Sequence, residues 1–337
     1  MSTRVIHTPD GFRDLYGESL KDKRALIGRL RWVFYEYGYE PIETPMVEYF
    51  DVFSSDIGTT PSRELYKFFD REGNTLVLRP DFTPSVARAV AMHFPDDKLP
   101  ARLCYEGSTF VNSAEYQGRF KEQTQMGIEL IGDGSANADA EVIALTAELL
   151  LAAGLTEFQV SVGEVEFFKA LADESGLNED QVADLRTLIS NKNLFGVEEY
   201  LLDLSVDPAL REAFVKLPNL FGDSGVLREA SAYAVNSRAR AAIGRLRDIE
   251  GILAGKGLSR YVSFDFGMLS KYRYYTGIIF SAYTYGVGEP VAKGGRYDSL
   301  LGHFGKEEPA VGVGIYLDHL MSALTRQKIE INKGDYV

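Results

Sequence analysis

The sequence predicts an α+β fold in which helices flank a largely antiparallel sheet. Segments with β-strand alternation are interleaved with long helical segments, and few β-α-β units of a parallel sheet can be recognised. Between residues 166 and 257, Leu-, Ala- and Glu-rich helical periodicity replaces this alternation. We therefore expect one core made from residues 1–165 and 258–337, with a helical insertion at 166–257.

The first elements follow from periodicity and from the residues that end them. Residues 19–37 have an apolar helical face, and Gly38 suits the end of a helix. Residues 41–47 are predicted to be extended, and Pro45 within them favours an edge or an interface. Residues 75–79 are predicted to form a strand that ends at the next proline.

A helix is predicted to follow, with Thr83 as its N-cap and Pro84 in its first turn. Strands are then expected at residues 101–105 and 124–131, and a long helix at 137–153 is closed by a glycine. In the insertion we predict helices at residues 178–189, 197–202, 208–214 and 238–254.

The last part of the chain returns to strand patterns. Strands are predicted at residues 261–266, 272–285 and 311–317, and a closing helix begins at Asp318. Residues 294–298, with two glycines and a charged pair, are predicted to form a turn.

Composition limits the class of function. The 337 residues contain 36 Lys and Arg against 49 Asp and Glu, a formal net charge of −13. Nucleic-acid and anionic-membrane surfaces need clustered basic residues, so neither partner is expected. The most apolar stretch, residues 144–155, is shorter than the roughly 20 residues that cross a membrane. Because the first residues also lack an apolar leader, we expect a cytoplasmic protein.

The sequence offers few metal ligands. Cys104 is its single cysteine, and its four histidines have no paired spacing. We expect neither a metal nor another cofactor.

Two polar segments are candidates for a binding site. In strand 124–131, alternation places Gln125, Gly127 and Glu129 on one face, where the glycine leaves a depression between an amide and a carboxylate. A small cationic or amide-bearing ligand would fit there, although a solvated strand face is the alternative. Residues 272–276 are rich in tyrosine, which suits either a pocket wall or a packed strand.

These segments, in this order, resemble the catalytic core of histidyl-tRNA synthetases. The resemblance implies a class II aminoacyl-tRNA synthetase-like fold with an antiparallel sheet flanked by helices. It rests on seven segments that are distributed along nearly the whole chain: residues 9–14, 37–45 with the motif proline Pro45, 78–83, 107–132, 274–277, 294–298 and 309–320.

The resemblance also implies a histidine pocket. In that family an acid, a threonine and a glutamine hold the α-amino group, and these positions are Asp81, Thr83 and Gln125 here. A second acid and a tyrosine pair contact the imidazole, and they correspond to Glu129, Tyr274 and Tyr275.

The residues that would hold ATP differ. Arginines of the family are replaced at four positions: Val111, Ala114, Ser270 and His319. Losing one such charge-stabilising donor typically lowers a rate by about 10²–10³, so we expect no synthetase activity and no catalytic residues. Three nearby cations could compensate in part: Arg119, Lys271 and Arg273.

A further difference from the family is length. The sequence continues for 17 residues beyond Leu320, so we expect no anticodon-binding domain and no tRNA partner. A core with a histidine pocket but without ATP arginines is similar to the regulatory subunits of ATP phosphoribosyltransferase. This resemblance implies a homodimer through residues 20–45, and a hetero-octamer with the short-form catalytic subunit. It also implies L-histidine as feedback effector in the first step of histidine biosynthesis.

Two other functions remain open from the residues alone. One is a ligase that activates an amino acid for a non-tRNA acceptor, for which Lys271 and Arg273 are the only support. The other is a stand-alone histidine sensor with a different partner.

Overall fold

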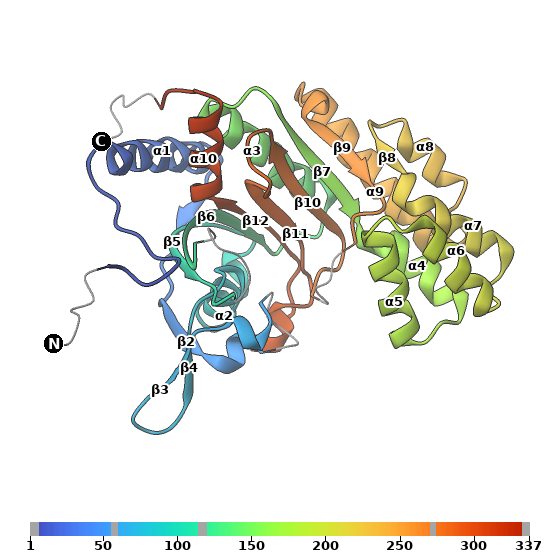
Figure 1. Cartoon of the computed structure of the whole chain (residues 1–337), viewed down its shortest axis with the longest axis horizontal. Coiled ribbons are helices and arrows are strands. Elements are labelled where there is room, and N and C mark those ends of the chain that lie inside the picture. Colours follow the sequence, from blue (N-terminus) through green and yellow to red (C-terminus); the bar gives the residue numbers. More distant parts are fainter. Residues whose placement is uncertain (1–6, 55–59, 114–119, 270–273, 332–337) are drawn as a thin grey trace.

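A nine-stranded sheet forms the centre of the computed structural model, which describes residues 7–54, 60–113, 120–269 and 274–331 (Figure 1). All neighbouring strands are antiparallel except the β1–β5 and β7–β9 pairs. The predicted α+β class with a largely antiparallel sheet is therefore confirmed. In spatial order the strands are β1 (Glu40–Pro41), β5 (Ala101–Phe110), β6 (Glu122–Ile131), β12 (Ala310–Tyr316), β11 (Ala292–Arg296), β10 (Ile278–Thr284), β7 (Phe158–Glu164), β9 (Val262–Asp265) and β8 (Phe221–Gly222).

A second, three-stranded sheet projects from one side of the molecule (Figure 1). Its strands are β2 (Val47–Tyr49), β4 (Thr75–Leu78) and β3 (Lys67–Phe69), in spatial order β2-β4-β3. The loop after β4 leads directly into helix α2, so this sheet positions one wall of the site described below.

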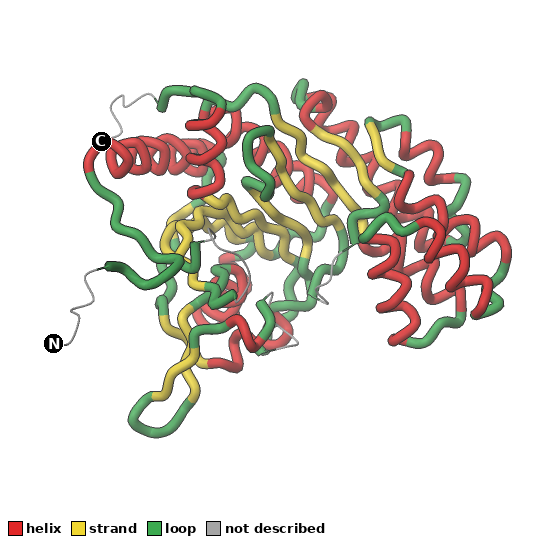
Figure 2. Tube along the Cα trace, viewed as in Figure 1, coloured by secondary structure: helices red, strands yellow, loops and turns green. Residues whose placement is uncertain are grey.

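The α-helices form two groups (Figure 2). Those around the central sheet are α1 (Gly17–Glu36), α2 (Thr83–His93), α3 (Ala136–Ala153) and α10 (Leu317–Arg326). Those between β7 and β9 are α4 (Val165–Ser175), α5 (Glu179–Ser190), α6 (Leu194–Asp203), α7 (Pro208–Lys216), α8 (Val226–Ser231) and α9 (Ser237–Gly255). Sequence periodicity missed α4 and α8. Within the described residues no helix is long and apolar enough to cross a membrane.

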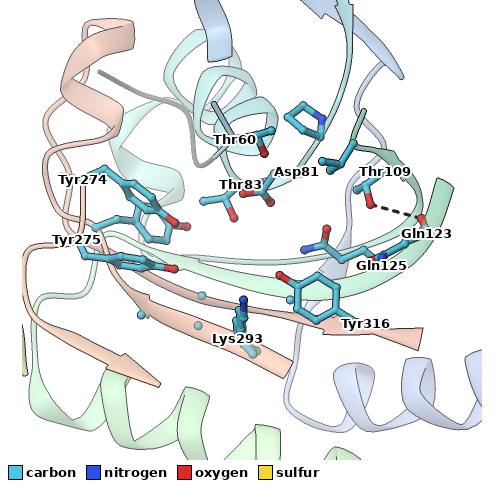
Figure 3. Close-up of a pocket in the computed structure, with 18 residues that line it drawn as sticks. Thr60, Asp81, Thr83, Thr109, Gln123, Gln125, Tyr274, Tyr275, Lys293 and Tyr316 are labelled. Carbon is cyan, nitrogen blue, oxygen red and sulfur yellow. Dashed lines mark hydrogen bonds between the residues drawn. The ribbon is translucent and has the colours of Figure 1, made fainter. Parts of the chain in front are cut away.

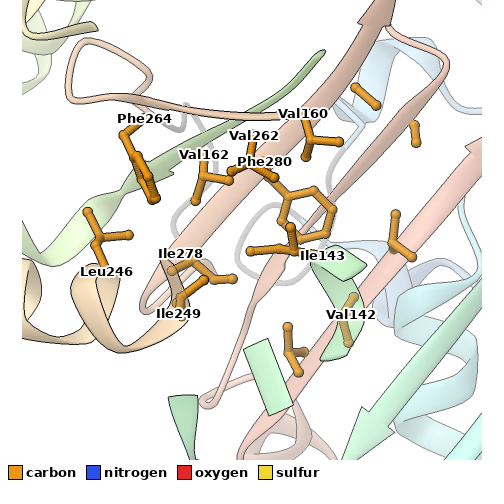
Figure 4. Packing of buried hydrophobic residues seen from close by; sticks show 14 of the residues in the cluster. Val142, Ile143, Val160, Val162, Leu246, Ile249, Val262, Phe264, Ile278 and Phe280 are labelled. Carbon is orange, nitrogen blue, oxygen red and sulfur yellow. The ribbon is translucent and has the colours of Figure 1, made fainter. Parts of the chain in front are cut away.

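Helix α3 is the central element of the main core. It begins after Ser135, whose hydroxyl accepts a hydrogen bond from the Ala138 amide, and it ends at Gly154 with φ at 102°. Its Val142 and Ile143 lie in the same core as side chains from β7, β10 and α9 (Figure 4). Because α3 is buried on most of its surface, it joins the sheet to the second group of helices.

A buried carboxylate strengthens this junction. Asp139 of α3 is fully buried and forms ion pairs with Arg296 of β11 at 2.7 Å and with Arg245 of α9 at 2.6 Å. Arg245 also donates to the carbonyl groups of Gly134 and Ser135. The contact fixes where α9 lies against the core, and removing one partner of the buried pair would leave an uncompensated charge.

The structure corrects the start of α2. Thr83 is its first helical residue, and the preceding Phe82 occupies the N-cap position without a side-chain cap. The predicted capping role is wrong because the Thr83 hydroxyl instead donates to Glu129, 2.7 Å away.

The predicted turn at residues 294–298 is also wrong, since Gly294 to Arg296 belong to β11. Side chains fill the space above these glycines: a Cβ on Gly294 would lie 2.3 Å from the Phe280 ring. The predicted strand 272–285 is shorter, because β10 begins at Ile278. The first two residues of the predicted strand, 272 and 273, lie outside the described part of the chain.

Candidate functional site

A small polar cavity lies on one face of the central sheet, between the start of α2 and strands β6, β11 and β12 (Figure 3). It encloses about 170 Å³, below the roughly 300–1,000 Å³ typical of pockets for drug-sized ligands. Its size therefore suits a small metabolite. Five of the predicted site residues line it: Asp81, Thr83, Gln125, Tyr274 and Tyr275.

Glycines form much of the cavity floor and make room for the side chains above them. A Cβ on Gly312 would lie 1.7 Å from Glu129 Oε2, and one on Gly314 would lie 2.2 Å from Gln125 Nε2. Because such distances are impossible, any side chain at these two positions would displace the predicted ligand-binding groups.

Glu129 is buried directly behind the cavity rather than on its surface. Its side chain is 1% exposed and accepts hydrogen bonds from Thr83 Oγ1 at 2.7 Å, from the Tyr105 hydroxyl at 3.3 Å and from the Tyr297 hydroxyl. Thr83 and Tyr297 also line the cavity, so they stand between Glu129 and its interior. The predicted alternative of a solvated strand face is wrong, because Gln125 is also buried.

Burial controls the charge of Glu129. Desolvation raises the pKa of this carboxyl group to about 8, and the nearby charge of Asp81 adds to the rise. The hydrogen bonds from Tyr297, Thr83 and Tyr105 oppose it. At pH 7 the group is therefore mostly protonated, so that it can also donate a hydrogen bond.

The loop that carries Asp81 is held rigidly. Arg79 is buried and donates to the carbonyl groups of Thr44 and Ser108, while its guanidinium lies 3.8 Å from the centre of the Phe82 ring. The Thr83 amide donates to Asp81 Oδ1 at 3.3 Å. These contacts fix the carboxylate between β4 and α2 before any ligand arrives.

Tyrosines form the opposite end of the cavity. The rings of Tyr274 and Tyr275 are 4.2 Å apart, and Tyr297 meets Tyr274 edge to face at 6.1 Å. Lys169 of α4 donates to the Tyr275 carbonyl at 3.2 Å and so anchors this segment. A flat ring could pack against this wall while hydroxyl groups contact its edge.

Two residues of the site, Tyr105 and Tyr297, were not predicted from the sequence. A signal for Tyr105 exists in strand pairing, because it lies opposite Gly127 and its hydroxyl would lie 2.4 Å from a Cβ there. Tyr297 follows the glycine pair of β11, which the sequence analysis placed in a turn.

A second cavity of about 270 Å³ adjoins the first. Both are lined by Thr60, Val111, Gln123, Lys293 and Tyr316. The second also has acidic lining residues, Glu64 and Glu289, and among the described residues around it none is an arginine.

The two described positions where the family resemblance implies arginine are Val111 and His319, and both border this second cavity. His319 is turned toward the Pro290 carbonyl, to which its Nδ1 donates at 2.9 Å. The remaining replaced arginine positions and the cations near them lie outside the described residues: Ala114, Arg119, Ser270, Lys271 and Arg273. No group of three or more potential metal ligands is found in the part of the chain that the structure describes.

The antiparallel sheet agrees with the family profile and the solved structures described below, which together place the protein in the class II aminoacyl-tRNA synthetase-like fold. The sequence profile of the histidyl-tRNA synthetase family matches residues 11–320. Within that family, the chain belongs to the ATP phosphoribosyltransferase regulatory subunits.

Curated relatives support this assignment. A protein named ATP phosphoribosyltransferase regulatory subunit from Acetivibrio thermocellus is 42% identical over 333 residues, which cover 99% of this chain and 80% of the relative. The protein of the same name from Clostridium acetobutylicum is 37% identical over 320 residues, covering 94% and 79%.

Solved structures agree. An ATP phosphoribosyltransferase regulatory subunit/histidyl-tRNA synthetase from Bacillus halodurans superposes with a TM-score of 0.89 at 35% identity, covering 95% of this chain and 83% of that one. Histidyl-tRNA synthetase from Nostoc superposes with a TM-score of 0.81, covering 96% of this chain and 76% of that one. At 22% identity, the second match shows the fold alone.

Proposed function

We propose that the chain is a non-catalytic, cytoplasmic regulatory subunit that joins a short-form ATP phosphoribosyltransferase catalytic subunit in a hetero-octamer. The assembly would condense ATP with phosphoribosyl pyrophosphate in the first step of histidine biosynthesis. L-Histidine would be its feedback effector. The names of relatives that match nearly the whole chain support this role.

Histidine would occupy the first cavity. Asp81, Thr83 and Gln125 supply a carboxylate, a hydroxyl and an amide for the α-amino group. The imidazole would pack against Tyr274 and Tyr275, with Glu129 acting through the hydroxyl groups that it orients. As an allosteric ligand, histidine must bind two arrangements of the assembly with different affinities.

The contrast between the two cavities carries the proposal. The first keeps the groups suited to an amino acid, while the second is lined by Glu64 and Glu289 and by Val111 and His319 where the family resemblance implies arginine. ATP phosphates would meet two carboxylates and the single ammonium group of Lys293 there, which is less favourable for binding and for a charged transition state than arginines would be. A retained amino-acid site beside a poor phosphate site suits a sensor rather than a synthetase.

The homodimer would form through the segment that contains α1 and β1. Trp32 and Tyr35 of α1 are 55% and 45% exposed, and Met46 after β1 is 46% exposed. β1 is the edge strand of the large sheet, and both of its residues are exposed. Exposed aromatic residues beside a free sheet edge favour association with a second copy.

Calorimetric titration with L-histidine, repeated with ATP and magnesium, tests the ligand. Histidine binding without an ATP signal is the expected result, whereas ATP binding with pyrophosphate exchange would support the ligase alternative. Adding the chain to the short-form catalytic subunit should raise its rate, and histidine should lower it. An unchanged rate would favour the stand-alone sensor.

A further inference from the structure

Lys293 and Asp81 are the two charged side chains among the described residues that line the first cavity. Lys293 belongs to β11, is exposed, and directs its ammonium group into the cavity from the sheet (Figure 3). Asp81 lies across the cavity, beside the start of α2 (Figure 3). One cavity thus presents a positive and a negative group from two different elements.

Strand register explains why the lysine reaches this position. Lys293 pairs with Gly314 of β12, and Gly314 pairs with Gly127 of β6. Directly opposed residues lie on the same sheet face, so no Cβ stands beside the lysine on these two strands. The Gln125 amide and the Tyr105 hydroxyl occupy the space above Gly314 and Gly127 instead.

Neighbouring side chains flank Lys293 on its own sheet face. Alternation places Gly295 on the same face of β11, and the Tyr275 ring covers the space above that glycine. On the other side, Lys293 Nζ lies 6.0 Å from the centre of the Tyr316 ring. The ammonium group is therefore positioned where the first cavity meets the second, since Lys293 and Tyr316 line both.

We propose that Lys293 binds the α-carboxylate of the amino-acid ligand, an inference that rests on the proposed function. A free amino acid carries an ammonium and a carboxylate on one carbon, and the cavity offers Asp81 for the first and Lys293 for the second. Among the described residues that line the cavity none is an arginine, so Lys293 is the cation that they offer the carboxylate. A charge-assisted hydrogen bond from Lys293 would bind this carboxylate.

This role predicts selection for ligands with a free carboxylate. Histamine has the imidazole and the amine of histidine but lacks the carboxylate, and L-histidinol has an alcohol in its place. Both should bind the unmodified chain at least about tenfold more weakly than L-histidine, because neither forms the ion pair.

The test combines Lys293→Met and Lys293→Arg with calorimetric titration of the full chain. Lys293→Met should weaken L-histidine binding about tenfold or more and leave histamine binding unchanged, so that the preference for a carboxylate disappears. Lys293→Arg should restore most of that preference. Lys216→Met, which removes the same charge from an exposed position on α7, should bind like the unmodified chain.

The outcomes separate the two proposals. If the unmodified chain binds no histidine, alone or with the catalytic subunit, the proposed function fails. If it binds histidine but Lys293→Met keeps the full preference over histamine, the role of Lys293 is overturned while the histidine site stands. An equal loss of both ligands would mean that Lys293 shapes the cavity without binding the carboxylate, which also overturns the inference.

Discussion

The Tyr297 hydroxyl donates a hydrogen bond to the Glu129 carboxyl group behind the cavity, and the two side chains are only 2% and 1% exposed. Glu129 belongs to β6, whereas Tyr297 follows β11, and β12 lies between them in the sheet. Thr83 at the start of α2 donates to the same carboxyl group. One buried acid therefore links three segments that each contribute to the cavity wall.

This link makes the stability of the protein depend on pH. The pKa of Glu129 is about 8 in the folded chain and close to 4.5 when exposed. The folded state keeps its proton where the unfolded state has lost it, so the free energy of unfolding should fall as pH rises from about 4.5 to 8. Burial also raises the pKa of Glu164, to about 7, so this residue adds to the fall in the free energy of unfolding at pH values below about 7.

Urea denaturation at pH 6 and pH 8.5 measures the effect. Glu129→Gln keeps the shape of the side chain but cannot titrate. The variant should therefore lose less stability than the unmodified chain as pH rises, because each unit of pKa shift that is removed corresponds to about 1.4 kcal/mol of free energy of unfolding. Glu164→Gln should reduce only the part of the stability loss that occurs below about pH 7. If the stability of Glu129→Gln depends on pH in the same way as that of the unmodified chain, Glu129 does not hold a proton in the folded state.

A second prediction concerns ligand binding by Glu129→Ala. Without the carboxyl group, the hydroxyls of Thr83 and Tyr297 lose the partner that orients them at the cavity wall. We expect L-histidine binding to weaken at least about tenfold while assembly with the catalytic subunit is kept. Glu164→Gln serves as the control, because Glu164 is a buried acid of β7 that accepts a hydrogen bond from the Glu166 amide rather than from hydroxyl groups at the cavity wall. Histidine inhibition of the assembled complex that remains unchanged in Glu129→Ala would refute the site.

The sequence was informative where local chemistry determines structure. Helix α3 was predicted within one residue at its start and correctly at its end, because its helical pattern is strong and Gly154 ends it in the left-handed conformation. The strand with Gln125 and Glu129 was also predicted, because its apolar alternation is strict.

What the sequence did not predict depends on long-range register. Tyr105 meets Glu129 only because β5 pairs with β6. Tyr297 meets Glu129 only because β12 pairs with β6 and β11 pairs with β12. Alternation assigns a residue to a face but not to a neighbour. Thr83 was assigned to a cap for the same reason, since its real partner is 46 residues away in the chain.

Gly312→Ala tests the close packing of the cavity floor. A Cβ there would lie 1.7 Å from Glu129 Oε2 and 2.7 Å from the Ile128 carbonyl oxygen, so strand or side chain must move. We expect a loss of about 1–3 kcal/mol in stability and strongly weakened histidine binding. Gly288→Ala is the matched control, because a Cβ at Gly288 meets nothing within 4 Å. The packing argument fails if both variants bind histidine equally well in calorimetry.

The final prediction concerns the homodimer. A groove of about 530 Å³ lies between α1 and β1, and its lining includes Tyr35, Pro41 and Ile42. A negative charge beside it should prevent a second copy from packing there, because a buried unpaired carboxylate is costly. Trp32→Glu, on the exposed side of α1, should therefore convert a dimer to a monomer.

Size-exclusion chromatography with light scattering measures this change. Phe195→Glu provides the control, because Phe195 is 73% exposed on α6, distant from α1 (Figure 1). The control should keep the mass of the unmodified chain, since it places the same charge on a face that we do not assign to the interface. If Trp32→Glu remains dimeric while Phe195→Glu becomes monomeric, the second group of helices, rather than α1 and β1, forms the contact between copies.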